Sequence, residues 1–485
     1  RRGLLDAVGR LSPKRLTAQA YVDGRLLLRE QAFRRRWRCR APILHVGHHE
    51  AHAASAFFAS PFDEAAVLTL DRGGDFLSTT LSVGRGHRLR TLGTVRNPHS
   101  LGEVYSAFTY HLGFRPNSDE GKVMGLAPYG RNHLVPDVRQ LVQPTPDGLF
   151  QVNLRWFRYQ REGPLVSRRF ERTFGPRRVP DTGISSHHED LAYAVQDLTE
   201  TAGLHVARAL QRATGLRRLC LAGGVALNSV MNTRLLREAG FDDVFIQPAA
   251  SDSGNALGAA LWVWHHLMKA PRDWCMEHAR WGPEFNEPQL ERALQAASLP
   301  YRRVADPELD AAALLAGGRV VGRFTGRAEI GPRALGARSI LADPRRPEMK
   351  DVVNNRVKRR EPFRPFAPSV LHERGPDYFD GFHPTPFMLF VLPVRPEKRC
   401  VIPAVTHVDG TGRVQSVTRA SDPGFHRLIT NFERLTGVPV VLNTSFNVRG
   451  EPIVNTPQEA VADFVGTQID ALFLGPFLTE KAPPL

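Results

Sequence analysis

The 485-residue sequence lacks the features that mark membrane, secreted and thiol-based metal proteins. No apolar run approaches the roughly 18 residues of a membrane span, and no charged-then-apolar leader opens the printed sequence. Its four cysteines form no CxxC pair, which argues against a zinc ribbon or a disulfide framework. We therefore expect no membrane partner and no secretory signal, but a reduced, cytoplasmic compartment.

Lysine is also scarce, since it supplies only 7 of the 64 basic residues and arginine supplies the other 57. The resulting net charge of +15 raises the question of a polyanionic partner. A biased genome composition explains an arginine excess equally well, so we expect no nucleic-acid partner. A basic surface would still steer small phosphate compounds toward the protein.

What the sequence does contain is an alternation of strand-like and helix-like segments with glycine turns between them. Residues 65–71 predict a buried strand, and 188–213 has the apolar spacing of a long amphipathic helix. This alternation is typical of α/β proteins. The irregular segment 271–286 predicts a linker, which would separate a first domain at 1–270 from a second at 287–485.

A histidine pair and two aspartates form the first candidate site. His48 and His52 stand four residues apart, so on a helix both imidazoles face the same way and can bind one metal ion. The HHEAH motif is not HExxH, which excludes the zinc-protease interpretation. Asp71 ends the apolar strand and Asp252 lies in a Ser-Asp-Ser-Gly turn, and a carboxylate placed so needs a partner. This mixed nitrogen and oxygen set suits iron, manganese or zinc.

A Gly-Gly turn is the second candidate. Gly223 and Gly224 precede a helix that contains Asn228, where backbone N–H groups can approach a phosphate. Residues 117–126 resemble a phosphate loop but lack the Walker spacing, which argues against a P-loop NTPase.

Basic residues in glycine- and proline-rich segments of the second half form the third candidate. Arginines on rigid turns, as in GPRALGARS and FRPFAPS, make bidentate contacts with phosphate or carboxylate oxygens. Amides and hydroxyls of the Asn-Thr-Ser segment at 443–445 would complete an anion pocket. The basic candidates are Arg333, Arg338, Lys358, Arg364 and Arg413.

Long motifs resemble those of one family. HVGHHEAHAASAFF, VLTLDRGGD, EGKVMGLAPYG, LAGGVALNSVMN and ASDSGNALGAA resemble the first domain of the NodU/CmcH carbamoyltransferases, which include antibiotic enzymes such as the tobramycin carbamoyltransferase. GRAEIGPRALGARSIL, VKRREPFRPFAPSVL, GRVQSVTRASDPGFHRLI and VLNTSFNVRGEPIVNTP resemble their second domain. The motifs follow in the family's order over residues 43–480.

The resemblance implies an actin-like ATPase domain (ASKHA, RNase H-like) followed by a YrdC-like α/β domain. It implies an enzyme that makes carbamoyl adenylate from ATP and carbamoyl phosphate and transfers the carbamoyl group to a hydroxyl of a small molecule, a secondary metabolite or a sugar. It also implies a divalent metal, iron first, with manganese, zinc or magnesium as alternatives. A homodimer is left open.

The resemblance also assigns roles to individual residues. The metal would be held by His48, His52, Asp71 and Asp252. The nucleotide would lie beside Gly102, Lys122, Gly223, Gly224 and Asn228. Carbamoyl phosphate or the adenylate would be bound by Arg333, Lys358, Arg364, Arg413, Asn443 and Ser445.

The beginning of the sequence departs from the family. Relatives open with a strand hairpin and a His-Asp loop, whereas this sequence starts Arg1-Arg2-Gly3. We therefore expect a truncated first domain, a catalytic-base histidine in the missing segment, an unpaired edge beside the strand that ends at Asp71, and weak or no activity. Two rival functions remain: a tRNA threonylcarbamoyl-type transferase, which the C-terminal position of the second domain disfavours, and an inactive nucleotide-binding homologue.

Overall fold

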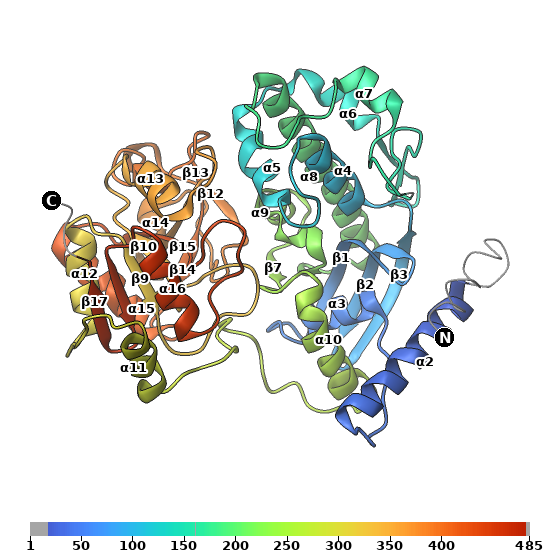
Figure 1. The fold of residues 1–485 in the computed structure, drawn as a ribbon. Coiled ribbons are helices and arrows are strands. Elements are labelled where there is room, and N and C mark those ends of the chain that lie inside the picture. Colours follow the sequence, from blue (N-terminus) through green and yellow to red (C-terminus); the bar gives the residue numbers. More distant parts are fainter. Residues whose placement is uncertain (1–17, 161, 482–485) are drawn as a thin grey trace.

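A computed structural model describes residues 18–160 and 162–481 of the chain. They form two α/β units, each built around one large sheet (Figure 1). Within the described residues, no helix is both long and apolar enough to cross a membrane.

The first unit has a five-stranded sheet in the order β3-β2-β1-β6-β7. The first three strands run antiparallel, and β6 and β7 run parallel to β1. This strand order is that of the RNase H-like sheet. The strands are β1 (Glu64–Gly74), β2 (Leu77–Arg85), β3 (Arg88–Arg96), β6 (Arg218–Ala222) and β7 (Asp243–Ile246).

Helices cover both faces of this sheet. On one face lie α3 (His48–Phe57) and α10 (Asn255–Leu261), and on the other α4 (Leu101–His111) and α8 (Ser186–Thr214) (Figure 1). The remaining elements of this half are α2 (Ala18–Trp37), α5 (Glu120–Leu126), α6 (Val135–Arg139), β4 (Val142–Pro144), β5 (Phe150–Val152), α7 (Arg168–Phe174) and α9 (Ser229–Glu238).

The side chains of β1 point alternately to the two faces of the sheet, so each face has its own set of residues. Ala65 and Val67 pack in the cluster that contains α3, whereas Ala66, Leu68 and Leu70 pack in the cluster that contains α4 and α8. Because side chains alternate along a strand, the next residues on the α3 face are Thr69 and Asp71. The strand therefore directs Asp71 toward the histidines of α3.

The expectation of an unpaired edge beside β1 is wrong. β1 is the central strand of the sheet: β2 pairs with it on one side and β6 on the other. The physical reason is a parallel crossover, because β6 arrives from about 150 residues along the chain and takes the position next to β1.

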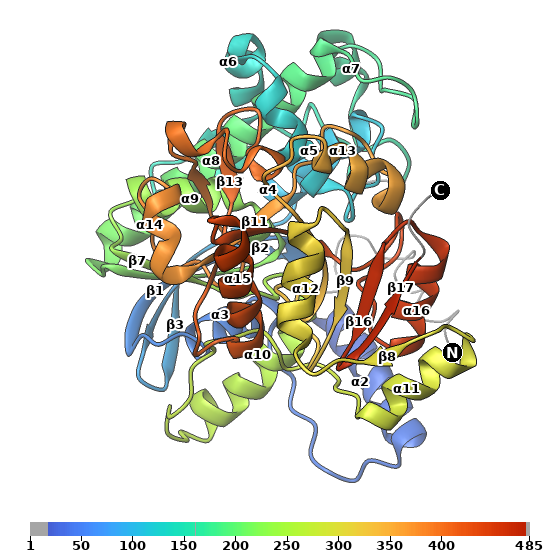
Figure 2. The same ribbon diagram turned by 90° about the vertical axis from the view of Figure 1, so that its left-hand side faces the viewer.

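The second unit has an eight-stranded mixed sheet in the order β14-β11-β15-β10-β9-β16-β17-β8. Figure 2 shows α12 and α15 side by side, and the two helices pack against each other. The strands are β8 (Arg302–Arg303), β9 (Val321–Phe324), β10 (Arg338–Ala342), β11 (Ala367–Leu371), β14 (Gln415–Val417), β15 (Val440–Ser445), β16 (Ala471–Leu474) and β17 (Phe477–Glu480). The helices are α11 (Glu287–Ala296), α12 (Pro307–Ala316), α13 (Met349–Val352), α14 (Gly375–Tyr378), α15 (Pro423–Thr436) and α16 (Pro457–Gly466), and β12 (Val391–Pro393) pairs with β13 (Thr411–Arg413).

Both sheets agree with the predicted fold class, an actin-like α/β unit followed by a YrdC-like α/β unit. The two units also share core. Residues 387–390 belong to the second half of the chain, yet their side chains pack in the hydrophobic cluster of the first unit. The Asn232 side chain of α9 donates to the Leu389 carbonyl at 3.0 Å. The boundaries at 270 and 287 stay a prediction.

Candidate active site

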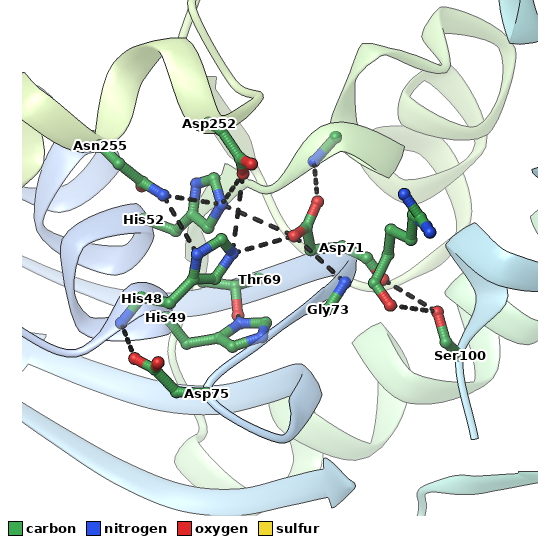
Figure 3. Close-up of polar contacts among 12 residues, drawn as sticks. His48, His49, His52, Thr69, Asp71, Gly73, Asp75, Ser100, Asp252 and Asn255 are labelled. Atoms are coloured by element: carbon green, nitrogen blue, oxygen red, sulfur yellow. Dashed lines mark hydrogen bonds and ion pairs between the residues drawn. The ribbon is translucent and has the colours of Figure 1, made fainter. Parts of the chain in front are cut away.

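The four predicted metal ligands come together at one point (Figure 3). His48 Nε2 lies 2.9 Å from Asp71 Oδ2, and His52 Nε2 lies 3.4 Å from Asp252 Oδ1. The four ligand atoms are within 4.8 Å of one another. Ligands on opposite sides of a transition-metal ion at about 2.2 Å are about 4.4 Å apart, so a small shift of the most distant pair lets these atoms surround one such ion.

Three separate elements bring these side chains together. The first two turns of α3 carry both histidines on one face, β1 carries Asp71, and the turn before α10 carries Asp252. His52 is fully buried, whereas the Asp252 side chain is 76% exposed. The cluster therefore has a buried floor and one side open to solvent.

The electrostatics of the cluster favour ionised carboxylates. Burial alone would raise the pKa of Asp71, but the hydrogen bond with His48, the Gly224 N–H at 2.8 Å and the nearby imidazoles hold that pKa well below its usual range. The hydrogen bond with His52 lowers the pKa of Asp252. Two anionic oxygens and two imidazole nitrogens are a donor set that suits a divalent transition metal.

Sequence reasoning missed two residues beside the cluster. Asn255 Nδ2 lies 3.5 Å from His48 Nδ1 and 3.4 Å from His52 Nε2. Asp75 Oδ2 accepts the backbone N–H of His48 at 2.7 Å and so anchors the start of α3. Asn255 ends the ASDSGN segment that contains Asp252, so the motif held a signal for it. Asp75 gave none.

His49 belongs to the same motif but not to the cluster. Its Nδ1 lies 2.7 Å from Thr69 Oγ1, and Thr69 also bonds Thr80. Burial lowers the pKa of His49 to about 4. It is a neutral core histidine.

Three of the predicted nucleotide residues are glycines packed around the end of β1. A Cβ on Gly102 would lie 2.7 Å from the Arg72 backbone, and one on Gly223, whose φ is +93°, would lie 2.2 Å from the Leu70 carbonyl oxygen. Only glycine permits these approaches. The Gly224 N–H is already used by Asp71.

The other two nucleotide candidates have protein partners. Asn228 caps α9 through the Met231 N–H, and its side-chain amide exchanges hydrogen bonds with Gln196. Lys122 Nζ lies 3.3 Å from Asp119 and 3.0 Å from Glu361 of the second unit. The nucleotide role of all five residues stays a prediction.

In the second unit, three predicted arginines form a group of like charges. Burial and the charge of Arg364 lower the pKa of Arg333 to about 10. Burial and the charges of Arg333, Arg360 and Arg364 lower the pKa of Arg413 well below its usual range. Among the described residues, Nε of Arg333 and Nε of Arg413 are buried without a hydrogen-bond partner. We call Arg333, Arg360, Arg364 and Arg413 the arginine cluster.

The remaining anion-site candidates line the same region but contact protein groups. Lys358 Nζ donates to Ser445 Oγ at 3.2 Å and to Asn447 Oδ1 at 2.6 Å. Asn443 Nδ2 donates to Ser369 Oγ and to Gln415 Oε1, each at 3.0 Å. Lys358 therefore holds the chain after β15 in place.

Arg338 lies apart from the arginine cluster. It is completely buried, its guanidinium stacks 3.6 Å from the centroid of the Phe324 ring, and it donates to the Thr325 carbonyl at 2.8 Å. Its interactions are structural.

Two residues of the VKRREPFRP segment were missed. Arg360 donates to Asn354 Oδ1 at 2.7 Å and lies over Phe366. Glu361 is 3.9 Å from Arg364 and accepts the inter-unit hydrogen bond from Lys122. Through this pair the arginine cluster is joined to α5 of the first unit.

The family relationship follows from two matches that together span most of the chain. Residues 14–261 match the family model of the carbamoyltransferase N-terminus, and residues 312–481 match that of the carbamoyltransferase C-terminus. Nodulation protein NolO of Bradyrhizobium diazoefficiens is 43% identical over 446 residues, which cover 90% of this chain and 79% of that protein. The uncharacterized protein sll1178 of Synechocystis is 44% identical over 470 residues, which cover 91% and 76%.

A solved structure, full-length HypF in the phosphate- and nucleotide-bound form, aligns with a TM-score of 0.28 and 12% identity over 49% of this chain and 45% of that one. A likeness of that size carries no argument. The two family matches and the 43% identity with NolO confirm the resemblance to the NodU/CmcH enzymes. The protein therefore belongs to the carbamoyltransferase family, as an enzyme of the NodU type.

Proposed function

We propose that the protein is an ATP- and carbamoyl-phosphate-dependent O-carbamoyltransferase of the cytoplasm. Carbamoyl phosphate, ATP and one water would give carbamoyl adenylate, pyrophosphate and phosphate. The hydroxyl oxygen of a small-molecule acceptor would then attack the carbamoyl carbon, AMP would leave, and the hydroxyl proton would pass to a base that we do not assign.

The observation that carries this proposal is the arginine cluster. Four guanidinium groups lower one another's pKa, and the carboxylates that oppose this effect at Arg364 are Glu361 and Asp119. Buried like charges with unpartnered N–H groups are unfavourable unless an anion joins them. Carbamoyl phosphate carries about two negative charges and offers several acceptor oxygens, which suits bidentate arginine contacts.

The cluster at the end of β1 supports the nucleotide half of the proposal. His48, His52, Asp71 and Asp252 would hold a divalent metal, iron first and manganese, zinc or magnesium otherwise, which would offset charge on the nucleotide phosphates. Gly102, Gly223 and Gly224 leave the backbone bare beside the cluster, so a phosphate can come close to it.

Residues between the units would protect the intermediate. Carbamoyl adenylate hydrolyses readily, so it must be made and used away from water. The shared core at 387–390 and the Lys122–Glu361 pair fix the arginine cluster against the first unit. Lys358 would position the Ser445 side chain rather than bind the anion itself.

The test is carbamoyl-phosphate-dependent release of pyrophosphate from ATP by the full chain. Arg364→Ala should slow this release by about 100-fold, because one fixed cation is lost at the site of developing charge, and should change ATP affinity less than about twofold. Arg356→Ala, an exposed arginine of the same segment, is the matched control and should behave as the unchanged protein. Pyrophosphate release that persists in Arg364→Ala would refute the assignment.

A further inference from the structure

A hollow in the surface of the first unit has no place in the function described so far. Its lining residues lie between β5 and the first turn of α7, the helix labelled at the top of the first unit in Figure 1, and its volume is about 560 Å³. Leu154 and Phe157 give it an apolar side. We call residues 154–160 and 162–169 the basic segment. Two backbone hydrogen bonds hold its two halves together: the Arg158 N–H donates to the Leu165 carbonyl at 2.8 Å, and the Ser167 N–H donates to the Trp156 carbonyl at 2.9 Å.

The hollow is strongly basic. Its lining includes Arg155, Arg158, Arg168 and Arg169, and no aspartate or glutamate within the described residues. Among the described residues, no ion pair joins any of these four arginines to a carboxylate. By contrast, Arg139, Arg217 and Arg234 of the same unit each pair with a carboxylate. The Arg169 guanidinium is held 4.3 Å from the centroid of the Trp156 ring. Four unneutralised cations around one hollow create a positive potential that attracts anions.

A short chain of contacts connects the segment that carries the hollow with the end of β1. Tyr159, on the basic segment, donates its hydroxyl to the Pro98 carbonyl at 2.8 Å, and the Val152 N–H donates to His99 Nδ1 at 3.1 Å. The same turn continues to Ser100, whose hydroxyl donates to the Asp71 carbonyl at 3.2 Å and to the Arg72 carbonyl at 2.8 Å (Figure 3). Residues 97–100 therefore contact both the segment that carries the hollow and the end of β1, from which Asp71 extends.

We propose that this hollow binds the phosphate-bearing end of the hydroxyl acceptor, so that the acceptor of this carbamoyltransferase is a phosphorylated compound such as a sugar phosphate. The inference rests on the proposed function and adds the class of the acceptor to it. Planar guanidinium groups bind phosphate oxygens bidentately, and the apolar side at Leu154 and Phe157 suits the carbon skeleton. The hollow is separate from the arginine cluster, which belongs to the second unit.

Isothermal titration of the full chain, with a non-hydrolysable ATP analogue present, tests the proposal. The probes are glucose 6-phosphate and glucose, which differ only in the phosphate. Glucose 6-phosphate should bind and glucose should not. The double variant Arg155→Glu with Arg168→Glu should weaken this binding by at least about 10-fold, the effect of losing charged hydrogen bonds. The control with the same charge change, Arg292→Glu with Arg434→Glu, alters two exposed arginines of α11 and α15 and should leave it unchanged.

Each other outcome overturns the proposal. If both sugars bind equally, or if neither binds, the hollow does not recognise the phosphate group. Binding lost in Arg413→Met but kept in the double variant places the sugar phosphate at the arginine cluster. A short single-stranded RNA that binds in place of the sugar phosphate, and is lost in the double variant, assigns the hollow to a polyanion. Pyrophosphate release measured without acceptor distinguishes a failure of the proposed function from a failure of the acceptor class. If the unchanged protein releases no pyrophosphate, the proposed function is refuted. If it releases pyrophosphate and the titration is negative, only the acceptor class is refuted.

Discussion

The metal cluster and the arginine cluster solve the same problem, holding charge away from water, in opposite ways. At the metal cluster two carboxylates face two imidazoles at 2.9 to 3.9 Å, so that unlike groups stabilise one another before any ligand arrives. At the arginine cluster guanidinium groups lower one another's pKa, and the four cations outnumber the two nearby carboxylates, Glu361 and Asp119.

The difference teaches what each site requires of its ligand. A site with balanced charge can be preformed, and a ligand only replaces interactions that already exist. A site with an excess of one charge is destabilised while empty, and an anion relieves the repulsion when it binds. The metal cluster should therefore stabilise the free protein, whereas the arginine cluster should destabilise the free protein and bind anions strongly.

The largest expected effect is that of Asp71→Asn. The change removes one anionic ligand and the partner of His48 but keeps the shape of the side chain. We expect iron content after anaerobic reconstitution to fall from about one equivalent to a small fraction, and pyrophosphate release to fall by at least about 100-fold. Elemental analysis and the release assay measure both quantities. Asp137→Asn, at an exposed position of α6, is the control, and full iron content in Asp71→Asn would show that the cluster is not a metal site.

The second prediction concerns the excess of positive charge. Arg413→Met roughly keeps the length of the side chain and removes one half-buried cation whose buried Nε has no described partner. Without ligand, the melting temperature should rise by about 2 °C, and added inorganic phosphate should stabilise the variant less than the unchanged protein. Thermal melts with and without phosphate measure this, with Arg356→Met as control. A lower melting temperature in the free variant would mean that Arg413 is satisfied in the empty site.

The sequence allowed prediction of the metal cluster because the direction of each side chain within its own element is a local property. The i, i+4 spacing of His48 and His52 and the placement of Asp71 at the end of an apolar strand define directions that any helix and strand would give. The packing of α3 against β1 and the approach of Asp252 needed the fold, and the turn that carries Asp252, before a helix, is a common place for a functional side chain.

Three members of the arginine cluster, Arg333, Arg364 and Arg413, could be predicted from the sequence, but neither the fourth member nor their arrangement could. Lys358 and Arg360 are two residues apart in one basic segment, yet Lys358 is buried against Ser445 and Arg360 joins the cluster. The Lys122–Glu361 contact joins residues 239 positions apart. No local pattern encodes such a contact, because it depends on how two units pack. The basic hollow escaped notice for a related reason: in a chain with 57 arginines, their number does not reveal which ones share a surface.

A third prediction addresses the link between the two clusters. Lys122→Met removes the partner of Glu361, which would leave that carboxylate free to neutralise Arg364. The KM for carbamoyl phosphate should rise about fivefold, the effect of roughly 1 kcal/mol, and the KM for ATP should change less than about twofold. Steady-state kinetics with Lys122→Arg as the charge-keeping control would measure both. A rise confined to the KM for ATP would support instead the nucleotide role predicted from the sequence.

The smallest effect concerns an aspartate whose titration is opposite to that of Asp71. Asp463 of α16 lies beside Lys358, but burial and the charge of Glu451 outweigh this cation and raise the pKa of Asp463 to about 6 from a usual value of 3.8. Between these two values the folded protein keeps a proton that the unfolded chain has lost. Stability contributed by that proton is therefore lost as pH rises through this window.

Asp463→Asn should accordingly raise the melting temperature at pH 7.5 by about 2 °C and leave it nearly unchanged at pH 4, where the aspartate is neutral in the folded protein. Glu451→Gln removes only the second cause of the raised pKa, so its effect should have the same sign and be smaller. Melts of the three proteins at both pH values provide the measurement. An equal shift of Asp463→Asn at both pH values would mean that the gain comes from hydrogen bonding or packing. A shift at pH 7.5 alone would show that the second unit tolerates a disfavoured carboxylate beside its cations, whereas the first unit holds Asp71 ionised.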